Sequence, residues 1–171
     1  MALVIPILII WFRTVHGHYG AAGDQLSLAG YDRPLVPKHI TVVLPISHMT
    51  RAMIPVLDYA RSFGSDIRAV SVDLEPQETA QMKAQWEVWG GGVPLVILPS
   101  PYRSFLVPCL TYIGEIRERD PAGWVTVILP EVIPARWWQT LLHNQRALLI
   151  RAALLFKPGV IVTAVPYHLE R

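Results

Sequence analysis

The residues best suited to bind a ligand lie at the junction that follows an apolar run at 124–130. The run ends in Pro-Glu, and the chain then enters a helix whose first turn contains Arg136, Trp137 and Trp138. Unpaired backbone N–H groups at the start of a helix attract anions, and Arg136 adds a positive charge there. The junction therefore predicts an anion site. An alternative interpretation pairs Arg136 with Glu131 and makes both tryptophans core residues.

The alternative depends on an apolar stripe along the same helix, which we predict over residues 136–156. One helical face contains six large apolar residues: Trp138, Leu141, Leu142, Leu148, Leu149 and Leu155. Under this interpretation the stripe belongs to the core, and the tryptophans bind no ligand. The sequence leaves both interpretations open.

Further candidates for ligand binding follow other apolar runs. In an open α/β sheet, ligands bind beyond the carboxyl ends of the strands, where the winding reverses direction. If the first and fourth strands are central neighbours, the loops 45–50 and 130–136 face each other. Asp73 and the segment 100–104 then flank them. The candidate ligand-binding residues are Pro45, Ser47, Asp73, Arg103, Glu131 and Arg136.

The patterns that define catalytic and metal sites are incomplete in this sequence. Neither GxGxxG nor a Walker lysine is present. Ser47 and His48 are adjacent, but no acid partner that would orient the histidine can be named. His16 and His18 lack a third metal ligand in range. We therefore predict no catalytic residue, no metal site and no cofactor.

Apolar runs and helical periods alternate from residue 39 onwards. The predicted strands are 40–46, 66–74, 93–100, 124–130 and 160–168, and the predicted helices are 50–64, 76–92, 104–120 and 136–156. Short continuous apolar runs are typical of strands buried on both faces of a parallel sheet. Five strands alternating with four helices predict an α/β fold with a doubly wound, mostly parallel sheet.

Composition favours one folded α/β domain in a chain of 171 residues. The formal net charge of +2 comes from cations dispersed among acids, so nucleic-acid binding has little support. The single cysteine, Cys109, excludes an internal disulfide and lies on the apolar side of a predicted helix. We expect Cys109 to be a small core residue.

The first twelve residues are strongly apolar, but they are too few to cross a bilayer alone. One interpretation is an interfacial helix or a buried arm. The other is the last turns of a transmembrane helix, with Trp11 and Arg13 at the membrane boundary. Residues 14–38 have no sustained period, and we predict that they form a linker.

Three long segments, residues 5–19, 93–116 and 129–169, resemble the carboxyl-terminal part of amino acid-polyamine-organocation superfamily permeases. The resemblance is greatest to potassium-uptake permeases with a universal-stress-protein-like cytosolic domain. It implies that residues 1–13 end the last transmembrane helix, with 14–38 as linker and 39–171 as the cytosolic domain. It also implies five parallel strands in the order 3-2-1-4-5, in domains that pair as homodimers.

The resemblance implies a non-catalytic regulatory and dimerisation domain of a secondary active permease for amino acids or potassium. The domain is then expected on the cytoplasmic side of the cell membrane, beside the permease body. Trp137 and Trp138 are candidate interface residues, since large aromatic side chains are favoured at interfaces. The transported substrate is not encoded in this region.

Cyclic di-AMP and ATP are the ligands that the resemblance suggests. ATP-binding members of the universal-stress family have a GxxGx9G(S/T) pattern after the fourth strand, and residues 131–145 contain no glycine. This departure counts against ATP. Cyclic di-AMP is a dianion that Arg136 and Arg103 would attract. The alternative function is a stand-alone, nucleotide-binding universal-stress-like protein.

Overall fold

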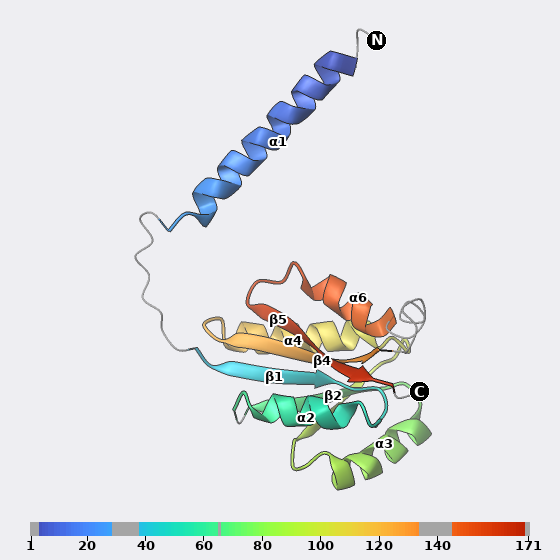
Figure 1. Ribbon diagram of the computed structural model, residues 1–171. Helices are drawn as coiled ribbons and strands as arrows, with labels where there is room; N and C mark the ends of the chain where they lie inside the picture. The colour runs from blue at the N-terminus through green and yellow to red at the C-terminus, as the bar shows by residue number, and fades with distance from the viewer. Residues whose placement is uncertain (1–3, 29–37, 65, 134–144, 170–171) are drawn as a thin grey trace. The chain divides into compact units, whose positions relative to one another are not determined.

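The computed structural model describes residues 4–28, 38–64, 66–133 and 145–169. The chain forms two units, Met1–Pro37 and Lys38–Arg171. The first contains α1 (Val4–Leu26). The second contains, in order, β1 (Ile40–Pro45), α2 (Met53–Arg61), β2 (Ile67–Asp73), α3 (Pro76–Trp89), β3 (Leu95–Pro99), α4 (Leu106–Arg119), β4 (Trp124–Ile133), α6 (Gln145–Leu154) and β5 (Val160–His168), as Figure 1 shows.

The five strands form one parallel sheet in the order β3-β2-β1-β4-β5. The predicted α/β class and strand order are therefore confirmed. β1 is central because Val43 pairs with Arg68 of β2 on one side and with Val127 of β4 on the other. This arrangement places the carboxyl ends of all five strands at one edge of the sheet.

Two apolar layers cover the sheet, with α2 and α3 on one face and α4 and α6 on the other (Figure 1). Side chains along β1 alternate between them, as the period of two in a strand requires. Val42 and Leu44 pack in the layer under α2 and α3, whereas Val43 packs under α4. Cys109 is buried in the second layer, as expected, and burial raises the pKa of its thiol to about 12.

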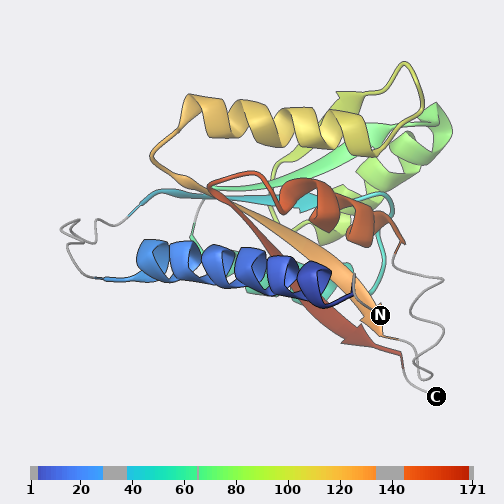
Figure 2. The same cartoon turned by 90° about the horizontal axis from the view of Figure 1, so that it is seen from above.

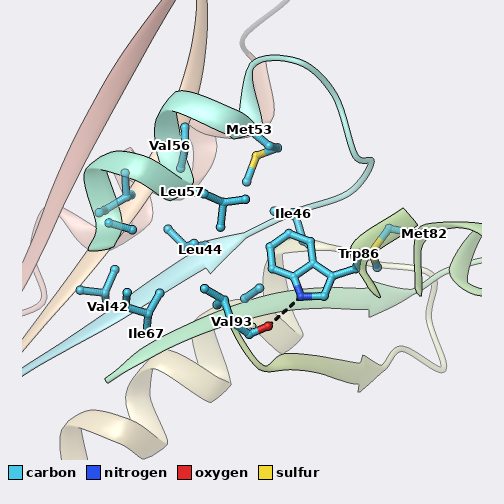
Figure 3. Close-up of a cluster of buried hydrophobic side chains, with 13 residues drawn as sticks. Val42, Leu44, Ile46, Met53, Val56, Leu57, Ile67, Met82, Trp86 and Val93 are labelled. Carbon is cyan, nitrogen blue, oxygen red and sulfur yellow. Dashed lines mark hydrogen bonds between the residues drawn. The ribbon is translucent and has the colours of Figure 1, made fainter. Parts of the chain in front are cut away.

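The first layer is closed by Trp86 of α3. Its indole Nε1–H donates a hydrogen bond of 2.8 Å to the carbonyl oxygen of Val93, which precedes β3 (Figure 3). Met53 and Leu57 of α2 fill the same layer from the other helix. The hydrogen bond satisfies the indole N–H, so the ring packs in the core without leaving a buried donor unpaired.

β4 is longer than the sequence pattern predicts, since it continues from Pro130 to Ile133. β4 pairs with β1 up to Val127, whereas it pairs with β5 from Val125 to Ile133. Pro130 thus lies where the strand has one partner, and a missing N–H is tolerated at such a position. Pairing with β5 therefore extends β4 beyond the end that the sequence pattern of β4 alone predicts.

Helix α6 contacts α4, β4 and β5, and it lies across β4 and β5 beside α4 in Figure 2. Its core residues are Ile150 and Leu154. The apolar stripe considered from the sequence does not belong to the core at its described positions, because Leu148, Leu149 and Leu155 are exposed. That part of the interpretation is wrong. The three remaining members of the stripe lie outside the described residues.

Helix α1 extends through residues 14–26, so the first half of the expected linker is helical. Its large apolar side chains from Val4 to Phe12 are exposed, and Arg13 follows them. Among the described residues, no helix combines the length and the apolar character that crossing a membrane requires.

Candidate functional site

The candidate site lies at the edge of the sheet where β1, β2 and β3 end and α3 begins. Asp73 is the last residue of β2, and its Oδ1 accepts a hydrogen bond of 2.7 Å from Thr79 Oγ1. The backbone N–H of Thr79 donates to the carbonyl oxygen of Glu75 at 3.0 Å. These two bonds hold the first turn of α3 against the end of β2. The Asp73 carboxylate is thus already used in positioning the helix.

Arg103 lies in the loop between β3 and α4 and forms an ion pair with Glu75, with 3.1 Å between Nη2 and Oε1. Its backbone is left-handed, with φ of 51°. Ser100 stabilises this turn, because its Oγ donates to the Ser104 carbonyl oxygen at 2.8 Å and accepts from the Ser104 N–H at 2.9 Å. The ion pair is largely exposed and is worth little to stability, so Arg103 is available to an incoming anion.

Ser47 follows β1 and lines a small hollow between the loop after β1 and the start of α3. The other lining residues are His48, Ser71, Val72, Leu74, Glu75, Glu78, Thr79, Met82 and Phe105. The volume of the hollow is about 40 Å³, which is room for a few water molecules. Sites for drug-sized ligands usually enclose about 300 Å³ or more. A nucleotide therefore cannot be enclosed in this hollow.

The remaining candidates are placed differently. Pro45 is buried at the end of β1, in register with Val70 of β2, and is not among the residues that line the hollow. Glu131 is half-buried in β4, paired with Pro166 of β5, and is not among the residues that line the hollow. The structure thus brings Ser47, Asp73 and Arg103 together around the start of α3, but does not place Glu131 with them.

Arg136, Trp137 and Trp138 lie outside the described residues, as does most of the junction from which the anion site was predicted. The pairing of Arg136 with Glu131 and the role of the two tryptophans therefore stay predictions.

Sequence reasoning missed Thr79 and Phe105 in the surroundings of this edge. Thr79 could have been found, because it lies six residues after Asp73, within the first turn of the helix that follows the strand. Phe105 could not, since the turn from Ser100 to Ser104 determines where it lies. The part of the chain that the structure describes has no group of three potential metal ligands.

Two comparisons with known proteins bear on this chain. Residues 37–167 match the model of the family described as "KimA potassium transporter C-terminal domain". The chain is also 30% identical over 171 residues to the "Potassium transporter KimA" of Bacillus subtilis (strain 168). That alignment covers 99% of this chain and 28% of the relative, so the chain spans less than a third of the relative's length.

Proposed function

Because the chain belongs to the family of KimA potassium transporter C-terminal domains, we propose that it is a non-catalytic regulatory domain of a potassium permease. The observation that supports this proposal is the family match, which covers residues 37–167 and so includes four strands completely and β5 up to Tyr167. Under the proposal, the permease body in the cell membrane transports the ion. The sheet unit lies on the cytoplasmic side and alters the activity of that body.

A regulatory unit of this kind acts by binding a ligand or a partner better in one state of the transporter than in another. The loops at the carboxyl ends of the strands are the natural place for such a ligand, since Arg103 and Ser47 lie there. The proposal includes homodimers, with Trp137 and Trp138 as interface residues.

Transport measurements test the regulatory role. The complete permease that contains this chain is expressed in cells without their own potassium uptake, beside a version that ends before Lys38. We expect both to support growth at low potassium, and only the complete permease to reduce its uptake when potassium is abundant. Equal uptake by both versions at every potassium concentration would reject a regulatory role, and no uptake by the complete permease would reject potassium as the substrate.

The finer proposal is that the ligand is an anionic nucleotide, of which cyclic di-AMP, a dianion, is the first candidate and ATP the second. Support comes from the exposed Arg103 in its left-handed turn and from the positive charge of Arg136 in the sequence. Because the hollow near Ser47 measures only about 40 Å³, the nucleotide would lie across the surface of the edge.

Isothermal titration of the 171-residue chain with cyclic di-AMP, and separately with ATP, tests the nucleotide site. Arg103→Ala and Arg136→Ala are each expected to weaken binding about 10- to 150-fold, since a hydrogen bond to a charged group contributes about 1.5–3 kcal/mol. Arg61→Ala is the matched control, because Arg61 donates to the Gly91 carbonyl oxygen near the other end of α3. Unchanged affinity in both variants would remove the arginines from the site.

The stand-alone, nucleotide-binding protein remains the second candidate function. The DNA upstream of the first codon separates the two. An open reading frame that continues upstream with a series of apolar spans supports the permease, whereas a stop codon followed by a ribosome-binding site at Met1 supports the stand-alone protein.

A further inference from the structure

Helix α6 presents an apolar face to solvent on the side opposite its core residues. We define the α6 outer face as Leu148, Leu149, Ala152, Leu155 and Phe156, all of which are exposed. The four large side chains are between 56% and 85% exposed. The Leu155 N–H donates to the Arg151 carbonyl oxygen at 3.0 Å, so the helical turn continues past the end of the helix at Leu154.

The spacing of these residues is that of one continuous stripe. Leu148, Ala152 and Leu155 follow one another at intervals of four and three residues, and Leu149, Ala152 and Phe156 at intervals of three and four. At 100° per residue, Leu148, Leu149, Ala152 and Leu155 lie within about 120° of the helix circumference, and Phe156 follows in the turn after the helix. Ile150 and Leu154, which pack against the sheet, point the other way. A surface helix normally places polar residues where this one has leucine and phenylalanine, so the outer face is built for contact.

The described charged residues of α6 and of the turn that follows it are of one sign. Arg151 lies on the flank of the stripe and Lys157 follows its end, and both are exposed. Residues 132–169 contain no aspartate or glutamate. Lys157 also lines a hollow of about 470 Å³ between α4 and the loop before β5, together with Arg117 and one acid, Glu118.

The Lys157 ammonium is held only weakly by protein, at 3.4 Å from the Leu110 carbonyl oxygen. Arg117 is bound more firmly, since it donates to the carbonyl oxygens of Pro158, Asp120 and Gly123 at 3.2, 2.8 and 3.2 Å. Lys157 is therefore the cation at this hollow that is best able to turn toward an anionic group.

We propose that the α6 outer face lies against an anionic phospholipid surface, with its leucines and Phe156 among the acyl chains and Arg151 and Lys157 at the phosphates. Leucine and phenylalanine beside arginine and lysine, without acids, is the composition of helices that bind in the membrane interface. Charge complementarity favours an anionic partner, because Arg151 and Lys157 are the charges described beside this face, and the exposed leucines and Phe156 match the acyl chains of a lipid surface. The inference rests on the proposed function, which holds the unit near a bilayer.

A fluorescent label that responds to its environment tests the proposal in the 171-residue chain. Ala152→Cys places the label in the α6 outer face, and Ala84→Cys places it at an exposed alanine of α3, on the opposite side of the sheet. Cys109 does not compete for the label at neutral pH, because it is buried and burial raises the pKa of its thiol. We expect vesicles of phosphatidylcholine and phosphatidylglycerol at 3:1 to shift the emission of the label at 152 to the blue.

The label at 84 is expected to keep its emission in the same vesicles, even when α1 brings the chain to them. Vesicles of phosphatidylcholine alone are expected to shift the label at 152 only at much higher lipid concentration. Arg151→Gln and Lys157→Gln should each raise the lipid concentration at half-shift about fivefold, since a cation near an anionic surface contributes about 1 kcal/mol. In these assays Ile5, Ile9 and Phe12 are replaced by glutamine to weaken vesicle binding through α1.

Three outcomes overturn the proposal. Equal shifts at 84 and 152 mean that the chain binds without using this face. A shift at 152 that grows with protein concentration in the absence of vesicles assigns the face to a second copy. No shift at 152 in anionic vesicles removes lipid as the partner. Since no permease is present, these results are independent of the transport assay, and either inference can fail without the other.

Discussion

The Asp66 carboxylate, at the amino end of β2, accepts several hydrogen bonds. It accepts hydrogen bonds from Thr41 Oγ1 at 2.8 Å and from Arg68 Nε and Nη2 at 2.9 and 3.3 Å, and His39 lies 3.8 Å away. Partial burial acts to raise the pKa of Asp66, but the hydrogen bonds and charges of these neighbours outweigh burial and lower that pKa below its ordinary value. The folded state therefore favours the ionised carboxylate.

Asp66→Asn is expected to lower the free energy of unfolding at pH 7 by about 1–3 kcal/mol, because hydrogen bonds to a charged acceptor are lost. A carboxyl whose pKa is lower in the folded chain contributes stability above its unfolded pKa of about 4. That contribution disappears as the pH falls through the lowered value. Urea unfolding of both chains is measured between pH 7 and pH 3. The difference between their free energies of unfolding should become smaller as the pH falls.

The control for this carboxylate is Asp58→Asn on the exposed side of α2. We expect a change within about 0.5 kcal/mol, as for most surface substitutions. A gap between Asp66→Asn and the parent chain that stays constant with pH would mean that the charge of Asp66 is not what stabilises the fold.

Two tryptophans of α3 offer a second comparison, since Trp86 is buried and Trp89 is exposed. Trp86→Phe removes the indole donor from the Val93 carbonyl oxygen and leaves a gap in the first layer. We expect a loss of about 2–4 kcal/mol in the free energy of unfolding, against less than about 0.5 kcal/mol for Trp89→Phe. Denaturant titrations followed by far-UV circular dichroism measure both, and equal losses would contradict the assigned burial.

At the candidate site, the sequence predicted where residues lie better than what they contact. Asp73 and Arg103 were expected at the edge of the sheet because each follows an apolar run, and that position needs only local pattern. Their partners, Thr79 and Glu75, depend on the path of the intervening turns. No periodicity encodes such a path, so the ion pair and the hydrogen bond could be found only in three dimensions.

Strands and helices differ in how far the sequence determines them. The five strands were predicted from continuous β-branched runs, and β5 was predicted with both of its ends, because Gly159 and Pro158 precede it and a polar end follows. The orientation of α6 could not be predicted, since leucine, isoleucine and alanine occupy nearly its whole circumference. Only contact with β4, β5 and α4 selects which apolar side becomes core.

Neighbouring residues of α6 test that orientation. Ile150→Ala is expected to lower the free energy of unfolding by about 2–5 kcal/mol, because it leaves a cavity in the second layer. Leu149→Ala, with the adjacent side chain on the α6 outer face, should change it by less than about 0.5 kcal/mol. Urea unfolding of the two variants decides the matter, and a larger loss for Leu149→Ala would mean that α6 is turned the other way.

Strand order belongs to the whole molecule, and the alternation of strands and helices alone does not determine it. Each right-handed crossover can add its strand at either edge of a growing sheet, so several orders satisfy the same alternation. The order 3-2-1-4-5 was expected from the resemblance, and the sheet has it. Its consequence is that β1 lies between β2 and β4, so the loops after β1 and β2 border one hollow.

Among the described residues, both apolar layers are formed by side chains from Ile40 onwards. A chain that begins at Lys38 thus keeps every buried contact of those layers, and we expect its free energy of unfolding to lie within about 1 kcal/mol of that of the 171-residue chain.

A chain that ends at Gly159 loses β5, the partner of β4 along nine residue pairs, and should not unfold cooperatively. Calorimetry of the three chains compares them directly. A large loss in the chain from Lys38 would show that the first unit contributes to the stability of the sheet, and a cooperative transition without β5 would show that four strands are sufficient for the fold.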